Sequence, residues 1–329
     1  MFINFVLIFE EKYRTMKIKS LKEYNNQKEK FTKNPQKFWE EKANKFVWKK
    51  KWAEVLDWDF NEAKIKWFSG GKLNITENCL DRHLQKRGNQ VAIKWIANNP
   101  NEKSIDLTYK QLHKQVCKFS NVLKKHGIRK GDRVCLYMPM VLELSIAVLA
   151  CARIGAIHSV VFAGFSAKSL SDRINDAKCN ALITADGGFR GDKITPLKDI
   201  SDEAMQSTPS IKTCIVLQRT KSEVTMKSNR DYWWHNEMNG SAEYIDAEIM
   251  DAEDELFILY TSGSTGKPKG IVHSTAGYMI YSQYSFENVF QYSEGDIYWC
   301  TASIFVFKVS TSVTLNLGAR AIWKILCVI

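Results

Sequence analysis

The stretch from Tyr260 to Gly270 reads Tyr-Thr-Ser-Gly-Ser-Thr-Gly-Lys-Pro-Lys-Gly. Its glycines permit tight turns through which main-chain N–H groups can converge on an anion. Its hydroxyl groups can donate short hydrogen bonds to phosphate oxygens, and its lysines add positive charge. Apolar runs on both sides, Glu255–Tyr260 and Ile271-Val272, predict strands that hold this loop, which would grip the polyphosphate of ATP. The predicted phosphate contacts are Thr261, Ser262, Gly263, Ser264, Thr265, Gly266, Lys267, Lys269 and Gly270.

Two other interpretations of this loop fit the residues less well. A Walker-type P-loop has four residues between its glycines and a Ser or Thr directly after its lysine. Here two residues separate Gly263 from Gly266, and Pro268 follows Lys267. A flexible Gly/Ser linker is the second alternative, but linkers seldom begin at a buried strand or carry Lys-Pro-Lys.

Upstream of the loop, short β-branched runs alternate with amphipathic helical patterns, which predicts an α/β fold. Strands with near-continuous apolar runs are typical of parallel sheets covered by helices on both faces. Residues 218–254 are polar and predict an irregular insertion, and Asn34-Pro35 predicts a helix start. The expected strands are 91–96, 133–138, 157–162, 181–185, 213–217 and 255–260, and the expected helices are 112–126, 141–153, 169–177 and one after 196.

The charge of the chain is concentrated at its start. Residues 1–52 hold fourteen Lys/Arg against six Asp/Glu, which leaves a nearly balanced body within a net charge of +11. A solvated Lys-rich helix face explains this better than nucleic-acid binding, because no later spacing matches a nucleic-acid-binding module. The tryptophans of this region, Trp39, Trp48, Trp52 and Trp58, are expected to dock it onto the body.

The eight cysteines contain no CxxC pair, so neither a zinc site nor a disulfide scaffold is predicted. Several of them lie in apolar runs, which favours a reducing, cytoplasmic location. Phe2–Phe9 is apolar but too short to span a bilayer, and no membrane association is expected. Met16 opens a more conventional N-terminus, which makes residues 1–15 an over-called start.

Three segments carry a family resemblance. Tyr260–Gly270 resembles the signature of adenylate-forming, AMP-binding enzymes. Arg153–Ser166 (Arg-Ile-Gly-Ala-Ile-His-Ser-Val-Val-Phe-Ala-Gly-Phe-Ser) and Ala185–Lys193 (Ala-Asp-Gly-Gly-Phe-Arg-Gly-Asp-Lys) resemble the acetyl- and propionyl-CoA synthetase branch. So do Asp231–His235 and His273-Ser274. The similarity covers roughly residues 30–302 and implies mostly parallel sheets flanked by helices, the large N-terminal domain of the adenylate-forming fold.

The resemblance implies an acetate–CoA ligase. Acetate and Mg-ATP would give acetyl-AMP and pyrophosphate, and coenzyme A would then take the acetyl group. The residues that the resemblance assigns to CoA binding are Ala163, Gly164, Arg190, Gly191, Asp192 and Lys193. Asp192 stands where a small residue is expected. Without the resemblance, Arg190 and Lys193 are interpreted as surface charges.

The resemblance ends near Ala302. Residues 303–329 contain no Asp or Glu and no family motif, which fits a frameshift, an unspliced intron or an assembly error. The catalytic lysine lies, in this family, in a small C-terminal domain that is absent here. The resemblance therefore implies no catalytic residue in this chain and no activity for it alone. A non-catalytic ATP- or CoA-binding fragment, an unstable truncated product, and propionate as substrate remain as alternatives.

The expected division is 1–15, then a helical arm and docking region at 16–89, a partial AMP-binding domain at 90–302, and a non-family tail at 303–329. His158 is expected to be a hydrogen-bonded core histidine, and His273 has a structural role at least as readily as an orienting one. Trp233-Trp234-His235 is interpreted as a packing element.

Overall fold

The computed structural model describes residues 18–97, 99, 101–261, 268–293 and 295–298, and the backbone of 321–322. The helices are α2 (Leu21–Lys33), α3 (Pro35–Ala43), α4 (Ile75–Cys79), the 3₁₀ helix η1 (Asp81–His83), α5 (Leu84–Arg87), α6 (Tyr109–Lys125), α7 (Leu142–Arg153), α8 (Ala167–Ala177), α9 (Leu197–Met205), α10 (Trp234–Met238) and α11 (Thr275–Asn288). The strands are β1 (Glu54–Asp59), β2 (Lys64–Ser69), β3 (Lys72–Leu73), β4 (Val91–Trp95), β5 (Ile105–Thr108), β6 (Arg133–Leu136), β7 (Ile157–Val160), β8 (Ala181–Ala185), β9 (Gly188–Arg190), β10 (Lys193–Thr195), β11 (Thr213–Leu217), β12 (Asp231–Trp233), β13 (Met250–Asp251), β14 (Glu255–Thr261), β15 (Lys269–Ser274) and β16 (Ala321–Ile322).

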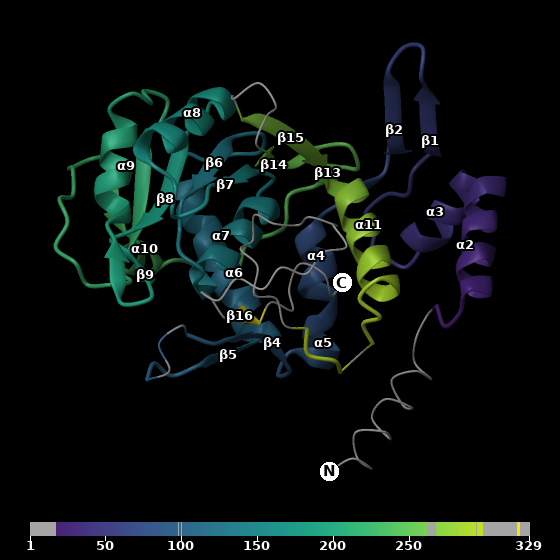
Figure 1. Cartoon of the computed structure of the whole chain (residues 1–329), viewed down its shortest axis with the longest axis horizontal. Coiled ribbons are helices and arrows are strands. Elements are labelled where there is room, and N and C mark those ends of the chain that lie inside the picture. The colour runs from purple at the N-terminus through teal and green to yellow at the C-terminus, as the bar shows by residue number, and fades with distance from the viewer. Residues whose placement is uncertain are drawn as a thin grey trace, which may run out of the picture.

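A seven-stranded sheet organises the body of the molecule (Figure 1). Its strand order is β12-β11-β8-β6-β7-β14-β15, and every neighbouring pair is parallel except β14 with the edge strand β15. The strands predicted at 133–138, 157–162, 181–185, 213–217 and 255–260 all lie in this sheet. The predicted parallel α/β architecture is confirmed.

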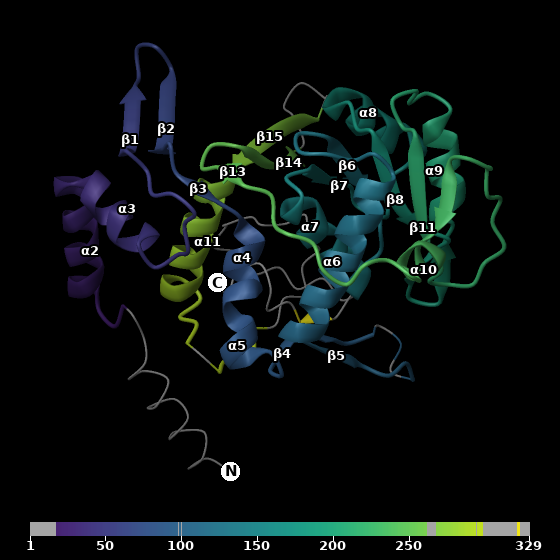
Figure 2. The ribbon, with the colours of Figure 1, turned by 180° about the vertical axis from the view of Figure 1, so that it is seen from behind.

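Helices cover both faces of the sheet, as Figures 1 and 2 show from opposite sides. The chain leaves β6 toward β7 and then crosses back from β7 to β8. Because such crossovers are right-handed, these opposite directions place α7 and α8 on opposite faces. Helix α6 packs beside α7, and α9 packs beside α8. The strand order therefore reverses between β6 and β8, the kind of position where doubly wound sheets bind ligands at the carboxyl ends of their strands.

Local sequence explains where α6 and α8 begin and end. Thr108 and Gln111 form a capping box at the start of α6, and Gly127 ends that helix in the left-handed region at φ 81°. Ser166 caps α8 by accepting a hydrogen bond from the Ser169 N–H. The backbone groups at the start and end of α6 and at the start of α8 therefore find local hydrogen-bond partners or turns, which fixes where the chain enters and leaves these helices.

The N-terminal region lies to one side of the sheet, with α11 and α4 between them in both views (Figures 1 and 2). Helix α3 begins at Pro35 with Asn34 as its cap, as predicted. Trp39, Trp48 and Trp52 pack against the hydrophobic core, which confirms their docking role. Trp58 does not dock: it lies on the projecting β1–β2 hairpin and is 53% exposed.

Two expectations about the fold were wrong in part. The strand predicted at 91–96 forms, but β4 pairs antiparallel with β5 in a separate small sheet, because an apolar run does not reveal the direction of its partner. The segment 218–254 is not irregular throughout, since it contains β12, α10 and β13. Trp234 of α10 stacks on Phe119 at 3.8 Å between ring centroids, so the packing role expected for the Trp233-Trp234-His235 run is confirmed for this residue.

Candidate functional site

The segment that follows β8 forms a short antiparallel hairpin. Strands β9 and β10 pair so that Arg190 lies opposite Lys193, with Gly191 and Asp192 as the connecting turn. Gly191 adopts φ 60°, a left-handed conformation in which glycine has no steric cost. All four residues are exposed. Directly opposite residues of an antiparallel pair have Cβ atoms about 5 Å apart, so the two cations can face one anionic ligand together.

The base of this hairpin is built around Asp186, which directly follows β8. Its side chain is 1% exposed. Its carboxylate accepts hydrogen bonds from the backbone N–H groups of Gly187 (2.7 Å), Arg219 (2.8 Å), Thr220 (3.0 Å) and Ser222 (3.2 Å). A buried carboxylate is tolerable when it is fully hydrogen-bonded. These donors bind the turn after β8 to the turn after the neighbouring strand β11.

The side chain of Arg219 supports the outer side of the same hairpin. Its guanidinium lies 5.1 Å from the ring centroid of Phe189 and 5.4 Å from that of Trp95. Its Nη2 donates to a carboxylate oxygen of Glu102 at 2.7 Å. The hairpin is thus held by a cation–π contact as well as by the hydrogen bonds to Asp186.

A second candidate loop follows β7. Ala163 is half-buried and Gly164 is exposed in this loop. A Cβ at Gly164 would lie 2.4 Å from the ring of the exposed Phe162, so a larger residue here would require that ring to move. Burial raises the pKa of Tyr137 to about 12, and its protonated hydroxyl donates a hydrogen bond to the Phe165 carbonyl at 2.7 Å. Tyr137 follows β6, so this bond joins the chain segments that follow the neighbouring strands β6 and β7.

The predicted phosphate loop continues from the end of β14. Thr261 pairs with Lys269, and Tyr260 pairs with Gly270. The other predicted contacts, Ser262, Gly263, Ser264, Thr265, Gly266 and Lys267, lie outside the described residues. The structure therefore establishes where this loop leaves and rejoins the sheet, and its phosphate-binding role stays a prediction.

Helix α8 connects the β7 loop to the end of β14. The Tyr260 hydroxyl donates to the Asp176 carboxylate at 2.5 Å, and burial together with this bond raises the pKa of Tyr260. The guanidinium of Arg173 lies 4.7 Å from the ring centroid of Phe165 and 5.6 Å from that of Tyr260. The two candidate loops are thus packed onto one helix.

The structure brings these predicted residues together only in part. The hairpin follows β8, the Ala163-Gly164 loop follows β7, and the phosphate loop follows β14. In the strand order, β8 lies two positions from β7 and three from β14, which correspond to about 10 Å and 14 Å at a spacing of about 4.8 Å per strand. Only an extended ligand could touch both halves of the predicted CoA set.

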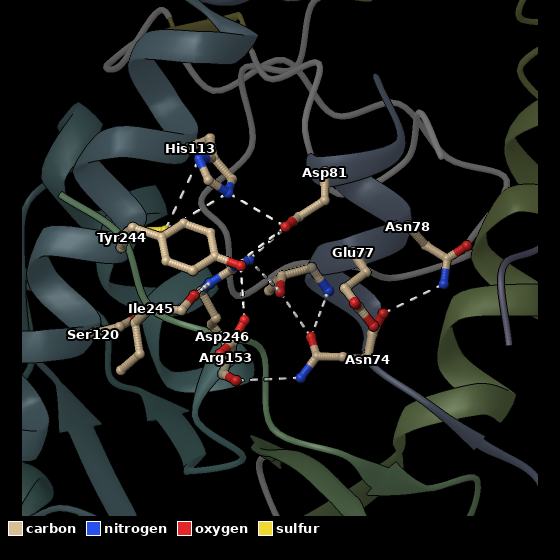
Figure 3. A network of polar contacts seen from close by, with 12 residues as sticks. Asn74, Glu77, Asn78, Asp81, His113, Ser120, Arg153, Tyr244, Ile245 and Asp246 are labelled. Atoms are coloured by element: carbon tan, nitrogen blue, oxygen red, sulfur yellow. Dashed lines mark hydrogen bonds and ion pairs between the residues drawn. The ribbon is translucent and has the colours of Figure 1, made fainter. Parts of the chain in front are cut away.

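A buried polar network joins the N-terminal region to the body (Figure 3). Arg153 of α7 donates through both terminal nitrogens to the Asp81 carboxylate, at 2.9 and 3.0 Å, and through Nε to the Ile245 carbonyl. His113 of α6 lies 3.3 Å from the same carboxylate. Asn74, which caps α4, donates to the carbonyls of Ala152 and Glu248. Residues from η1, α6 and α7, which are far apart in sequence, therefore form one charged network.

Neither of the two histidines singled out from the sequence has the surroundings of a catalytic base. Burial lowers the pKa of His158 to about 3, so the ring is neutral at physiological pH. Its Nδ1 has no hydrogen-bond partner among the described residues, so the expected hydrogen bond is absent at that atom. Burial also lowers the pKa of His273, whose ring stacks on Phe257 at 4.4 Å between centroids. Both belong to the packing of the β7–β14–β15 side.

The described part of the chain contains no cluster of three His, Cys, Asp or Glu side chains able to hold a metal ion. Its six described cysteines are buried and free, at positions 79, 117, 135, 151, 179 and 214. Over the same residues, none of the helices combines the length and the apolar character needed to cross a membrane.

Sequence reasoning missed the groups that position the site. Asp186 lies inside the segment that carries the resemblance, and a charge directly after a mostly apolar strand was the available signal. Tyr137 and Asp176 gave no signal, because their partners Phe165 and Tyr260 are 28 and 84 residues away along the chain. Arg219 has partners as distant as Glu102, 117 residues away.

Comparison with known proteins bears on the same segments. A family model described as AMP-binding enzyme matches residues 80–323, and one described as acetyl-coenzyme A synthetase N-terminus matches residues 24–79. A protein named acetyl-coenzyme A synthetase from Bdellovibrio bacteriovorus is 51% identical over 268 residues, which are 81% of this chain and 42% of that protein. One of the same name from Magnetococcus marinus is 48% identical over 299 residues, 91% of this chain and 45% of that protein.

The fold has a counterpart among solved structures. Acetoacetyl-CoA synthetase from Streptomyces lividans matches with a TM-score of 0.74 and 25% sequence identity, over 81% of this chain and 40% of that one. The chain therefore spans less than half the length of these relatives, and its fold is that of the N-terminal portion of an adenylate-forming enzyme. Since the AMP-binding model covers most of the 329 residues and the parallel sheet agrees with it, the chain belongs to the family of AMP-binding enzymes.

Proposed function

We propose that this chain supplies the ATP-phosphate surface and part of the coenzyme A surface of an acetate–CoA ligase. The observation that carries the proposal is the position of the phosphate-binding sequence. This predicted sequence begins at Thr261, at the carboxyl end of β14, and so lies on the same edge of the sheet as the carboxyl ends of β6 and β8, between which the strand order reverses. Ligands of doubly wound sheets bind at such positions, and a glycine-rich turn there can aim backbone N–H groups at phosphates.

In the proposed reaction a carboxylate oxygen of acetate attacks the α-phosphorus of ATP. The bond to the β,γ-diphosphate breaks, which yields acetyl-AMP and pyrophosphate. The thiol of coenzyme A then attacks the acetyl carbon, loses its proton, and displaces AMP. Negative charge grows on the departing pyrophosphate, so the Thr261 hydroxyl, the Lys269 ammonium and the predicted loop between them would stabilise that group electrostatically. Magnesium would enter with ATP as part of the substrate.

The candidate coenzyme A contacts have the charge and spacing for a long anionic ligand. Within the described residues, neither Arg190 nor Lys193 forms an ion pair with an acidic side chain. Both cations are therefore free to pair with the phosphates at the nucleotide end of CoA. Ala163 and Gly164 lie two strands away, on the side nearer β14, where a more distant part of the same molecule would pass.

Acetate is proposed as the acid because two of the most similar relatives are named acetyl-coenzyme A synthetases. Propionate or another short acid is the alternative substrate. The 329 residues span less than half of those relatives, so we expect this chain on its own to bind ATP and CoA without turnover. A non-catalytic binding fragment is the alternative function that the same binding data would support.

Titration calorimetry with ATP and with CoA tests the proposal on the purified chain. Lys267→Met should lower ATP affinity by about 10-fold or more, the effect of losing a hydrogen bond to a charged group, and leave CoA affinity unchanged. Arg190→Ala should do the reverse. Lys168→Met is the matched control, because among the described residues this exposed lysine forms an ion pair with Asp172 alone, on the surface of α8.

Two results would contradict the proposal. If ATP affinity is the same in Lys267→Met as in the unaltered chain, the loop does not bind the phosphates. If the purified chain releases pyrophosphate from ATP in the presence of acetate and CoA, the expectation of binding without turnover is wrong.

A further inference from the structure

The position of the β9–β10 hairpin depends on one buried acidic side chain. Asp186 presents a carboxylate to four backbone N–H groups, and none of its described partners is a cationic side chain. Peptide dipoles alone therefore balance its charge. Loss of the carboxylate would leave several buried donors without an acceptor, and each unpaired donor is costly.

The carboxylate joins the ends of two neighbouring strands. Strands β8 and β11 are paired in parallel, and the Asp186 N–H donates to the Leu217 carbonyl at 2.8 Å. Beyond that bond the strands end, and the donors from Arg219, Thr220 and Ser222 hold the turn after β11 against the start of the hairpin. Asp186 therefore holds the chain segments after β8 and β11 together beyond the last hydrogen bond between these two strands.

The turn after β11 touches both strands of the hairpin. A Cβ at Gly187 would lie 2.7 Å from Thr220 Oγ1 and 2.9 Å from Ile194 Cγ2, so the turn, Gly187 and β10 are packed without spare room. On the β9 side, Arg219 lies over the ring of Phe189. Movement of this turn would therefore move both strands, and with them the residues next to Phe189 and Ile194.

Those neighbouring residues are Arg190 and Lys193, the two cations of the candidate CoA site. We infer that Asp186 is a positioning residue for coenzyme A: by holding the 219–222 turn against Gly187, its carboxylate fixes the orientation of the hairpin and so the spacing of the two cations. This inference rests on the proposed CoA-binding role of the hairpin. It assigns Asp186 no contact with the ligand.

Asp186→Asn tests the inference, because asparagine has the same shape but lacks the charge and presents an amide NH₂ to the backbone donors. We expect CoA affinity to fall about 10-fold, while ATP affinity changes less than about 2-fold. Amide hydrogen exchange over residues 187–195 should accelerate about 10-fold in the unliganded chain, with no change over residues 142–153 of α7. Asp172→Asn on the surface of α8 is the matched control and should change none of these quantities.

The outcomes separate this inference from the proposed function. Unchanged exchange over 187–195 in Asp186→Asn, or an equal loss of ATP and CoA affinity, would overturn the positioning role. A third result is possible: the unaltered chain binds no CoA, but Asp186→Asn still accelerates exchange in the hairpin. That result would refute CoA as the ligand and would leave Asp186 as the residue that positions the hairpin. If Asp186→Asn does not fold, Gly187→Ala decides: it keeps every charge but pushes on Thr220 and Ile194, and it should weaken CoA binding selectively.

Discussion

The two sides of the seven-stranded sheet are built differently. On the β8–β11 side, both strands are buried along every residue, and the candidate CoA hairpin rises from this closed core. On the β14–β15 side, the edge strand exposes its apolar residues, with Ile271 at 46% and Val272 at 50%. Here Tyr260, in the strand that leads into the candidate phosphate loop, donates a hydrogen bond to the α8 side chain Asp176.

Charge is also distributed differently between the two sides. Lys198 of α9 is fully buried, and its ammonium lies 2.6 Å from an Asp202 oxygen and 2.9 Å from an Asp231 oxygen. Arg230 binds the same two carboxylates at 2.6 Å each. This four-residue cluster ties α9 to β12. No comparable cluster of buried ion pairs is described on the β14–β15 side.

The comparison indicates that the candidate CoA hairpin is anchored in the closed, stabilising side of the sheet, whereas the candidate phosphate loop is anchored on its more exposed side. Substitutions around β8, β11 and α9 should change the stability of the whole chain, because they disturb a closed core. Substitutions at β14 and β15 should leave global stability almost unchanged. The next three predictions test this contrast.

The largest effect is expected at the buried ion cluster. Lys198→Met keeps much of the side-chain volume but removes the ammonium, which leaves Asp202 and Asp231 with Arg230 as their remaining cation. Removing one partner from a buried pair costs about 3–5 kcal/mol, and we expect about 3 kcal/mol because Arg230 remains. Urea denaturation followed by circular dichroism measures the free energy of unfolding.

Lys168→Met is the control for this prediction. Lys168 also pairs with an aspartate four residues ahead, but on the exposed surface of α8. Exposed pairs of this kind contribute about 0–1 kcal/mol, so the variant should unfold close to the unaltered chain. Equal destabilisation by the two substitutions would show that burial of the cluster contributes nothing.

A matched pair of substitutions compares the two sides directly. Val216 of β11 is fully buried, whereas Val272 of β15 is half exposed. Threonine has the shape of valine, so Val216→Thr mainly places a hydroxyl without a partner in the core, at a cost of about 2 kcal/mol. Val272→Thr should stay within about 0.5 kcal/mol of the unaltered chain.

The same urea titration decides between the outcomes. A loss in Val272→Thr as large as that in Val216→Thr would mean that β15 is covered in solution, and the contrast between the two sides would fail. Ile215→Thr, also fully buried in β11, provides a second measurement on the closed side.

The sequence predicted the strands of the sheet because their apolar runs are local signals. Ala181–Ala185 and Thr213–Leu217 have the predicted boundaries, since each run is apolar apart from one threonine and ends at a polar residue or turn. Asp231–Trp233 was not predicted as a strand, because it is short and partly polar and depends on its pairing with β11 and on the ion pair of Asp231 with Lys198, partners that are distant in sequence. Partner choice, unlike strand formation, depends on residues far away in the sequence.

The candidate site divides in the same way. A glycine between basic residues predicts a turn, and Gly191 is indeed the left-handed residue between Arg190 and the Asp192-Lys193 pair. Three of the four donors that hold Asp186 come from residues 33 to 36 positions later, so no local pattern indicates them. Composition and spacing therefore indicate which groups can meet a ligand, but not which groups hold them in position.

The smallest effect is expected at the network that joins the N-terminal region to the body, and pH reveals it. The hydrogen bond to Asp81 outweighs burial and raises the pKa of His113 to about 9, from an ordinary value of 6.5. Burial alone would raise the pKa of Asp81, but hydrogen bonds from His113 and Arg153 lower it to about 2. The His113 contribution is therefore complete below pH 6.5 and is lost as the pH rises through 9, whereas the Asp81 contribution is lost only as the pH falls from about 4 toward 2.

We expect the free energy of unfolding to fall by about 1 kcal/mol between pH 6.5 and 9 because His113 loses its proton; solvent at the partly exposed Asp81 reduces the effect well below what the shift alone implies. His113→Gln keeps hydrogen-bonding capacity without a titrating group, so it should remove this part of the pH dependence. Lys198→Met should retain it, because that cluster lies at the other side of the sheet. If His113→Gln shows the same pH slope as the unaltered chain, the charge on His113 does not stabilise the Asp81 network, and Arg153 is the cation that holds Asp81 there.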